Sequence, residues 1–379
     1  PTRLGIVAPT AKQLAIARKA VAGGRSWRGA GEVWFAAAPL LGLGGGKLGF
    51  VFPGLEAEFA PRVAGIAEHF GLSTLPSLSR SPVGHIGEHC VAVLRLGRLL
   101  HAALARMSIA PDAIAGHSIG EWIGMTCAGL FSATEADQAL ESLHRTAPQV
   151  PELAFAVLGA PARRVTSELS AHPDVVLSHD NAPNQSIICG PAGALDGLVG
   201  SFRRRGVLAK VLPFQSGFHT PMLAPYLGPI RAAFANFALY PPRVPMWSAT
   251  TASEYPQGAD AVRELIIRHL LEPVRFRQLI EAMYAAGCAA FVQLGCGQLG
   301  SLISATLRGR EHLVIAATSP RHDGLAQLRR VATALWVDGL GVDRLSADEL
   351  DGPVAAGLGA RPVRLDLGAA LISLPAEHR

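Results

Sequence analysis

Ser118, in the stretch Gly116-His117-Ser118-Ile119-Gly120, is the residue whose surroundings best suit nucleophilic chemistry. Glycines on both sides of a serine permit a sharp turn between a strand and a helix, which holds the hydroxyl group out at the top of a sheet. Residues 112–115 form a predicted buried strand before the turn, and residues 121–128 form a predicted buried helix after it. The serine would then lie at a helix N-terminus, where backbone N–H groups favour a developing oxyanion. This pattern predicts a serine nucleophile.

A serine hydroxyl is too weakly acidic to attack an acyl group unaided, so a base must lie within hydrogen-bond reach. Among thirteen histidines, His219 is the best candidate, because it lies in the polar, glycine-containing turn of residues 215–221. A histidine on such a loop can also be merely solvated. His117, next to the serine, is expected to pack or to fill the cleft instead.

The composition favours a compact globular protein. Apolar residues make up 49% of the 379 residues and charged residues only 17%, and the length predicts two or three domains or subdomains. There is no apolar run long enough to span a membrane, no signal peptide and no lipidation motif. Aromatic and basic residues do not alternate as in nucleic-acid binders, so neither a membrane nor a nucleic acid is an expected partner.

The cysteines and basic residues bear on the setting of the protein. Five cysteines lie in apolar segments without the paired spacing of a zinc site, which predicts free thiols in a reducing, cytoplasmic compartment and no metal.

The net charge of +5 is spread out except for the arginines at 203–205, which are interpreted as a solvated helix end. The alternative is a dock for an acidic partner or a phosphorylated ligand. The chain begins with Pro1, which suggests a fragment of a longer protein.

The apolar pattern places the two reacting residues in an α/β fold. Residues 1–45 are predicted to form a small α/β unit, a buried strand at 48–54 ends at Pro53-Gly54, and a helix at 87–107 leads into the serine strand. In open α/β sheets the site lies where the strands end. Ser132 and Glu135 predict a capping box that opens another helix, with Arg145 in its last turn.

A different pattern begins near residue 152. Up to residue 212 the predicted order is β-α-β-β-α-β, which is typical of a ferredoxin-like subdomain. The larger unit, residues 46–151 and 213–322, then resumes with helices at 225–237, 259–271 and 274–286 and strands at 244–248, 289–295 and 312–317. Residues 323–379 are predicted to hold a C-terminal helix and an exit linker.

Three motifs in this order resemble one known family. They are Phe50-Val51-Phe52-Pro53-Gly54, the Ser118 motif continued to Glu121, and Phe218-His219-Thr220-Pro221, reinforced by residues 181–190 and 273–276. Together they resemble the acyltransferase domain of a type I polyketide or fatty acid synthase over about residues 46–320. Residues 1–45 are similar to the linker that follows a ketosynthase. The resemblance implies an α/β-hydrolase-like large subdomain with an inserted ferredoxin-like small subdomain.

The resemblance also implies a role for each matching residue. Ser118 would carry the acyl group, and His219 would be the general base and later the acid. Arg145 would hold a malonyl carboxylate bidentately. The other implied site residues are Leu55 and Ile119 for a backbone oxyanion hole, Phe218, His117 and Asn181 around the substrate, and His269 for orienting the histidine without a carboxylate.

The implied reaction loads malonyl units from malonyl-CoA onto the phosphopantetheine thiol of an acyl carrier protein, through a malonyl-serine intermediate, in polyketide biosynthesis. The chain itself would bind no cofactor, and a ketosynthase domain of the same polypeptide would be its neighbour. Phe218 before the histidine and Ile119 after the serine resemble the malonyl-selective pattern, because a bulky ring crowds an α-methyl branch.

The sequence departs from the family pattern at several positions. Leu55 stands where glutamine is usual, which preserves the role because only the backbone N–H is used. An ungapped count places the family arginine at Leu143, so Arg145 is reached by a two-residue shift. His269 stands where glutamine is common, and Cys296 where proline is common.

Two other interpretations stay open at this point. A serine esterase or thioesterase of the α/β-hydrolase type shares the turn around Ser118, but its histidine follows an acid near the end of the chain. His219 lies mid-chain instead. A non-catalytic docking module of a synthase would leave Ser118 inert, and labelling with malonyl-CoA separates these cases.

Overall fold

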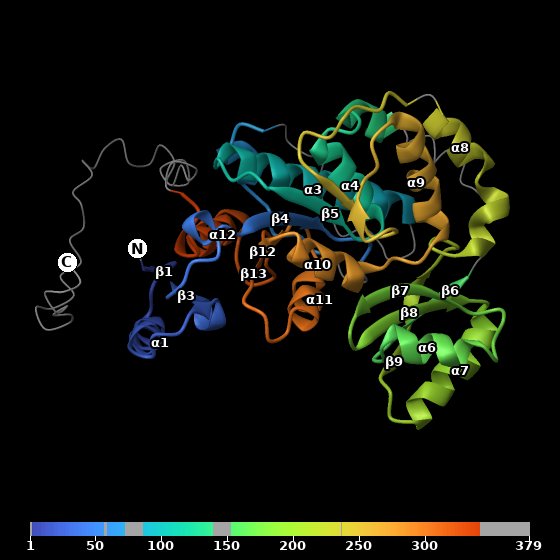
Figure 1. The fold of residues 1–379 in the computed structure, drawn as a ribbon, viewed down its shortest axis with the longest axis horizontal. Helices are drawn as coiled ribbons and strands as arrows, with labels where there is room; N and C mark the ends of the chain where they lie inside the picture. Colours follow the sequence, from blue (N-terminus) through green and yellow to red (C-terminus); the bar gives the residue numbers. More distant parts are fainter. Residues whose placement is uncertain (1, 57–58, 73–85, 139–152, 236, 342–379) are drawn as a thin grey trace, which may run out of the picture.

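The computed structural model describes residues 2–56, 59–72, 86–138, 153–235 and 237–341. Figure 1 shows a large α/β unit, a smaller sheet with two helices at one end, and a third sheet near the N-terminus. Within the described residues, no helix is both long enough and apolar enough to cross a membrane.

A six-stranded sheet forms the centre of the large unit, in the order β11-β10-β5-β4-β12-β13. Its strands are β4 (Lys47–Phe52), β5 (Ala113–Gly116), β10 (Met246–Ser248), β11 (Ser253–Glu254), β12 (Cys288–Gln293) and β13 (Leu313–Ala316). Neighbouring strands are parallel except β11, which pairs antiparallel with β10. Phe52 and Gly116 are register partners at the ends of β4 and β5, so the loops after these two strands start side by side.

Helices cover both faces of this sheet, which explains why its strands are apolar on both sides. Along β4, Leu48, Phe50 and Phe52 belong to one core cluster and Val51 to another, as the two-residue period of a strand requires. The first cluster is completed by α2 (Ile66–His69), α3 (Ile86–Arg106), α4 (Ile119–Ala128), α8 (Gly228–Ala235), α9 (Ala259–Leu271) and α12 (Gly324–Val337). The second is completed by α10 (Phe276–Ala285) and α11 (Leu299–Thr306).

Two local predictions in the large unit can be compared directly. The capping box is confirmed, because the N–H of Glu135 donates to Ser132 Oγ and the N–H of Ser132 donates to the Glu135 carboxylate. The helix predicted at 225–237 is present as α8, but it begins later than predicted, at Gly228. A 3₁₀ helix, η3 (Pro221–Tyr226), precedes a separate α8, because Pro225 and Pro229 lack the N–H groups that one continuous helix would use.

The smaller sheet consists of β6 (Ala154–Leu158), β7 (Val176–Ala182), β8 (Gln185–Gly190) and β9 (Ala209–Gln215), in the antiparallel order β7-β8-β6-β9. Helices α6 (Ala162–Leu169) and α7 (Ala192–Arg204) complete the predicted order β-α-β-β-α-β. The sheet has its own core, which includes Val165, Leu198 and Phe202.

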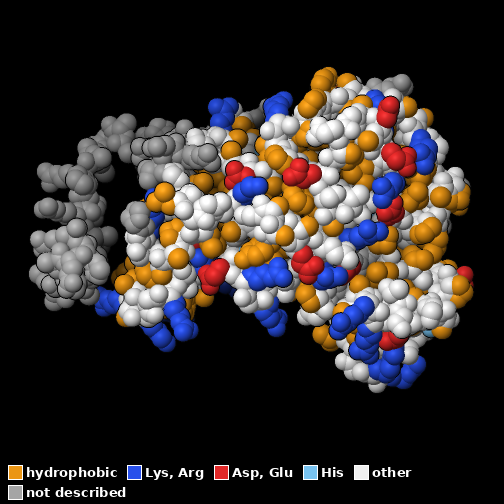
Figure 2. Space-filling model, in the orientation of Figure 1, with side chains coloured by type: hydrophobic (Ala, Val, Ile, Leu, Met, Phe, Trp, Pro, Cys, Tyr) orange, Lys and Arg blue, Asp and Glu red, His pale blue; other side chains and the backbone are white. Residues whose placement is uncertain are grey.

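Basic side chains gather on the outer surface of the smaller unit, at the lower right of Figure 2. Arg203 and Arg204 lie in the last turn of α7, and Arg205 follows directly after it. All three arginines are exposed, as the interpretation of a solvated helix end requires. Arg205 also pairs with the Glu168 carboxylate, so part of this charge is already compensated.

The end of β7 differs from the predicted strand, which stops at Ser178. The strand continues through the polar residues His179, Asp180 and Asn181, all of which are buried. The backbone of the extension pairs with the large unit, because Asp180 N–H donates to Val274 O and Val274 N–H donates to Ser178 O. The buried Asp180 carboxylate is compensated by the Arg277 guanidinium at 2.8 Å. This extension carries His179 and Asn181 to the junction of the two units.

The N-terminal sheet packs against the last described helix. Its elements are β1 (Arg3–Ile6), α1 (Ala11–Ala22), β2 (Trp27–Arg28), η1 (Ala30–Glu32), β3 (Val33–Ala36) and η2 (Gly42–Gly44), with strand order β1-β3-β2. Arg28 pairs with Asp338 at 3.0 Å and Glu32 with Arg330 at 3.0 Å. Helix α12 therefore joins the N-terminal sheet to the large unit, an arrangement that the sequence did not predict. The rest of the expected exit linker, residues 342–379, lies outside the described residues.

Candidate active site

Ser118 lies on a strained turn between β5 and α4. Its φ of 56° and ψ of −126° place a non-glycine residue in a sparsely populated region. Both flanking glycines are needed sterically: a Cβ on Gly116 would lie 2.1 Å from the backbone N of Glu121, and one on Gly120 would lie 2.0 Å from the Phe52 carbonyl oxygen. The tight approach to the end of β4 thus fixes the direction of the serine hydroxyl.

The hydroxyl of Ser118 meets the ring of His219, as the sequence predicted. Ser118 Oγ donates to His219 Nε2 at 2.7 Å, and His219 Nδ1 donates to the carbonyl oxygen of His269 at 2.8 Å. A carbonyl can only accept, so Nδ1 carries the ring proton and Nε2 is free to take one from the serine. His219 is 4% exposed, so it is not the merely solvated loop histidine of the alternative interpretation.

The two residues predicted to supply oxyanion amides lie on segments next to the serine. Ile119 is the first residue of α4, and Leu55 follows Gly54, whose added Cβ would lie 3.1 Å from Ser118 Cβ. Among the described contacts, no hydrogen bond engages the backbone N–H of Leu55 or of Ile119. Both donors are therefore available to a negatively charged oxygen formed at Ser118.

His269 orients His219 through its backbone rather than through its side chain. The imidazole of His269 instead supports the serine turn, because its Nε2 donates to the Ser118 carbonyl oxygen at 3.1 Å. On the other side of the ring, Nδ1 lies 3.0 Å from Thr250 Oγ1 and 3.3 Å from the Glu121 carboxylate. His269 therefore contacts both His219 and the serine turn, and the second contact was not indicated by the sequence.

Glu121 is the centre of a buried polar network that the sequence analysis missed. Its carboxylate is fully buried and accepts from Ser248 Oγ at 2.7 Å, from the Ala249 N–H at 2.9 Å and from the Tyr255 hydroxyl. A lone carboxylate within the otherwise apolar run of α4 was the available signal, because a buried charge needs partners. The network connects α4, the end of β10 and, through His269, α9.

Glu121→Ala is expected to lower the free energy of unfolding by about 3–5 kcal/mol, because it leaves several buried donors unpaired and opens a cavity. Glu121→Gln keeps the shape and one acceptor oxygen, so its loss should be clearly smaller. Chemical denaturation measures both variants, with Glu68→Ala on an exposed position of α2 as the control. A Glu121→Ala protein as stable as the wild type would contradict the network.

Four imidazole rings meet around the nucleophile. His179 is stacked on His117 with ring centroids 5.1 Å apart, and it meets His219 edge-on at 5.1 Å; His219 in turn meets His269 at 5.0 Å. Burial is the largest cause that lowers the pKa of His117 to about 4 and the pKa values of His179 and His219 well below 6.5. These three rings are therefore neutral near pH 7, as a base at His219 requires.

The expected substrate residues are only partly placed by the structure. His117 Nε2 donates to Asn181 Oδ1 at 2.8 Å, and Asn181 Nδ2 donates to Gln185 Oε1 at 3.0 Å, so these two side chains join the small unit to the serine turn. Phe218 is partly buried against the larger core. Arg145 and Leu143 lie outside the described residues. His179, which the sequence analysis did not single out, lies between His117 and His219.

Glu56, one residue beyond Leu55, is a partly buried carboxyl group with a predictable pH dependence. Burial raises its pKa from 4.5 to about 7, opposed by a hydrogen bond from the Gln298 backbone. The folded chain therefore binds more protons than the unfolded chain between these two pH values, so stability falls as pH rises through this window.

Glu56→Gln is expected to stabilise the protein by up to about 3 kcal/mol near pH 8 and hardly at all near pH 4. Denaturation at both pH values measures this effect, with the exposed Glu254→Gln as the control; equal effects at both would refute it.

A serine on a strained strand–helix turn, a neutral histidine on its hydroxyl and two free amides beside it are the arrangement of α/β proteins that form acyl-serine intermediates. The family model described as the acyl transferase domain matches residues 66–334. The chain therefore belongs to the acyl transferase domain family.

Individual relatives agree with this family. One component of a polyunsaturated fatty acid synthase from Thraustochytrium is 27% identical over 65% of this chain, and a phthioceranic/hydroxyphthioceranic acid synthase of Mycobacterium tuberculosis is 28% identical over 77% of it. The chain spans only 9% and 14% of these relatives' lengths.

Solved structures share the fold. The acyltransferase domain from the second module of the salinomycin polyketide synthase matches with a TM-score of 0.74 and 20% identity, covering 95% of this chain and 88% of that one. The malonyl-CoA:acyl carrier protein transacylase of Xanthomonas oryzae matches with a TM-score of 0.63 and 24% identity, covering 73% of this chain and 96% of that one.

Proposed function

We propose that this chain loads malonyl units from malonyl-CoA onto the phosphopantetheine thiol of an acyl carrier protein, through a malonyl ester on Ser118, in polyketide biosynthesis. The observation that carries the proposal is the 2.7 Å contact from Ser118 Oγ to His219 Nε2, with a backbone carbonyl and no carboxylate on the far side of the imidazole. The relatives are synthases of acyl chains, which supports the substrate class.

The reaction has two symmetrical halves. Ser118 Oγ attacks the malonyl thioester carbonyl while His219 Nε2 takes its proton, and the oxyanion is stabilised by the N–H groups of Leu55 and Ile119. The C–S bond then breaks, and His219 returns the proton to the departing coenzyme A thiolate. In the second half, the carrier thiol gives its proton to His219 and attacks the ester, and Ser118 regains the proton as it leaves.

Arg145 is the proposed partner of the malonyl carboxylate, and it supplies selectivity. Arg145→Ala is expected to reduce malonyl loading by about 10²-fold or more, because a desolvated carboxylate without a partner is costly by several kcal/mol. Acetyl loading has no such carboxylate and should change little. Rates of Ser118 acylation from malonyl-CoA and acetyl-CoA measure this ratio, and Leu143→Ala is the matched control for the alternative alignment. If Arg145→Ala leaves the ratio unchanged, the assignment is wrong.

Phe218 is the proposed reason for malonyl selectivity over methylmalonyl. Its ring directly precedes the base, and it is held against the core on one side. One methyl group discriminates by only about 1–3 kcal/mol, so a preference of roughly 10–200-fold is expected. Comparable loading rates from malonyl-CoA and methylmalonyl-CoA would overturn this part of the proposal.

The experiment that tests the whole function is mass spectrometry of the protein after incubation with malonyl-CoA, with and without a phosphopantetheinylated carrier protein. An acyltransferase accumulates malonyl-Ser118 alone and passes it to the carrier when one is present. An esterase or thioesterase releases free malonate at a rate that does not depend on the carrier. A docking module forms no adduct.

The wider setting is part of the same proposal. We assign residues 1–45 to the linker after a ketosynthase, residues 46–151 and 213–322 to an α/β-hydrolase-like subdomain, residues 152–212 to a ferredoxin-like subdomain, and residues 323–379 to a C-terminal helix and exit linker. The antiparallel order β7-β8-β6-β9 supports the ferredoxin-like name. The free thiols of all five cysteines support a reducing, cytoplasmic setting.

A further inference from the structure

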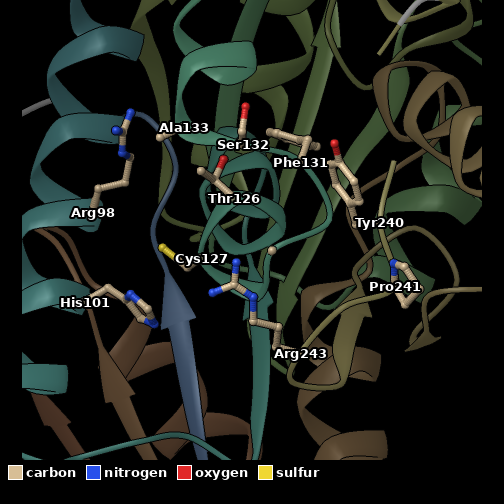
Figure 3. A pocket seen from close by; sticks show the side chains of 11 residues that line it. Arg98, His101, Thr126, Cys127, Phe131, Ser132, Ala133, Tyr240, Pro241 and Arg243 are labelled. Atoms are coloured by element: carbon tan, nitrogen blue, oxygen red, sulfur yellow. The ribbon is translucent and has the colours of Figure 1, made fainter. Parts of the chain in front are cut away.

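A pocket lined by Thr126, Cys127 and Gly129 lies at the C-terminal end of α4, whereas Ser118 precedes the start of this helix. Figure 3 shows the side chains that line the pocket. Its volume is about 640 Å³, which is within the range of small-molecule sites. Ser118 caps the start of α4 and Cys127 lies in its last turn, so the two sites are separated by about 13 Å along the helix. Acyl transfer at Ser118 makes no use of this pocket.

Arg243, in the segment before β10, provides the pocket with an uncompensated positive charge. Among the described residues, no acidic side chain pairs with its guanidinium, although its backbone N–H donates to the Ala128 carbonyl oxygen. The side chain crosses Gly129, where a Cβ would lie 3.1 Å from Arg243 Nε. Figure 3 shows the guanidinium directed toward Cys127, at the middle of the lining residues. The backbone bond anchors this residue beside the end of α4, and its guanidinium faces the pocket.

The other residues that line the pocket supply further hydrogen-bond donors. Arg98, on α3, donates one N–H group to Asp137 at 2.8 Å, and no other acceptor for its guanidinium is seen among the described residues. His101 and the hydroxyl groups of Ser132 and Tyr240 also line the pocket. Among the described residues that line the pocket there is no carboxylate. A cavity with two guanidinium groups and no carboxylate selects an anion.

The pocket is equipped for binding rather than for chemistry. Burial raises the pKa of the Cys127 thiol to about 12, so the sulfur stays protonated near neutral pH and is a poor nucleophile and a poor metal ligand. Ser132 Oγ accepts the N–H of Glu135 in the capping box and has no base of its own among these contacts. A bound molecule would therefore be held without being transformed.

The positions of the guanidinium groups and of the apolar side chains indicate which class of ligand the pocket would bind. A single guanidinium can satisfy a carboxylate bidentately, whereas two guanidinium groups from different walls suit a dianion with oxygens in several directions. Phe131, Tyr240 and Pro241 form an apolar wall beside the donors, which leaves room for an organic body. We propose that this pocket binds a phosphate monoester that carries a small aromatic or apolar group. The inference is independent of the acyl-transfer proposal.

Isothermal titration calorimetry tests the site with three probes: phenyl phosphate, inorganic phosphate and benzoate. Phenyl phosphate should bind saturably with one site per chain, at least about 10-fold more tightly than either of the others, because it alone offers both the dianion and the ring. Arg243→Gln and Arg98→Gln should each weaken it by about 10-fold or more. Arg18→Gln, an equal charge change on an exposed position of α1, should leave it unchanged.

Each result of these titrations either supports or overturns the proposed binding site. Arg243 is exposed and unpaired, so its substitution should leave the ligand-free unfolding midpoint unchanged and report on binding alone. Equal weakening by Arg18→Gln would show nonspecific charge binding and overturn the site. Benzoate binding as tight as phenyl phosphate would overturn the ligand class, and the lack of any saturable binding would overturn both. Retention of binding in Ser118→Ala protein supports a site distinct from the acyl cleft.

Discussion

Ser118→Ala is expected to abolish the malonyl-enzyme adduct and to lower malonyl transfer to the carrier by a factor of about 10⁴ or more. The Ser118 hydroxyl is the group of this residue that contacts His219 Nε2, and alanine removes it. Alanine keeps the Cβ atom, so the backbone of the turn should stay unchanged. Intact-protein mass spectrometry after incubation with malonyl-CoA measures the adduct, and a carrier-loading assay measures the rate.

The matched control for this variant is Ser167→Ala on an exposed position of α6, which should acylate at the wild-type rate. Peptide mapping of the wild-type adduct should locate the added mass on the peptide that contains Ser118. An adduct that persists on Ser118→Ala protein, or one that maps to another residue of the wild type, would remove the serine from the mechanism. Loss of the adduct with unchanged carrier loading would instead exclude the covalent route.

Sequence alone predicted the serine nucleophile because the backbone requirements at Ser118 are local. Gly116 and Gly120 have no room for a side chain, and the sequence shows both glycines directly. His219, about a hundred residues later in the chain, is favoured by its polar, glycine-containing turn, and its meeting with Ser118 is further implied by the family resemblance and not by periodicity. Local patterns do not specify which loops meet, because that depends on strand order.

The residues that the sequence missed are those whose role depends on burial between distant segments. Glu121 is a lone carboxylate in a predicted buried helix, and its partners on β10, after β10 and on α9 are distant in the sequence. His179 looks like the end of a strand until Val274 continues the pairing. Arg98 and Arg243 come from distant parts of the chain, and they line one pocket because α3 packs beside α4 and the Arg243 backbone bonds to Ala128 at the end of α4. In each case the tertiary contacts of the residue, and not the polarity of the neighbouring sequence, determine its role.

His219→Ala is the second substitution with a large expected effect. Acylation of Ser118 should fall by about 10²–10⁴-fold, because general base catalysis is lost while the oxyanion donors remain. Added imidazole should restore part of the rate by occupying the space of the missing ring. His172→Ala, at an exposed position, is the control and should have wild-type activity. Stopped-flow or quenched acylation measures the rate, and no response to imidazole would argue against a base at this position.

The pH profile distinguishes a catalytic base from a structural histidine at the same place. Burial, followed by the charge of His269, holds the pKa of His219 well below 6.5, so its Nε2 is unprotonated over a wide range. The wild-type acylation rate should therefore stay constant as pH falls through 6.5 and decline only at more acidic pH, where the ring gains a proton. The unfolded chain binds that proton already near 6.5, so stability should fall together with pH below this value. A half-maximal rate at an ordinary histidine pKa would mean that the ring is solvated and that the site is more open than the 4% exposure of His219 allows.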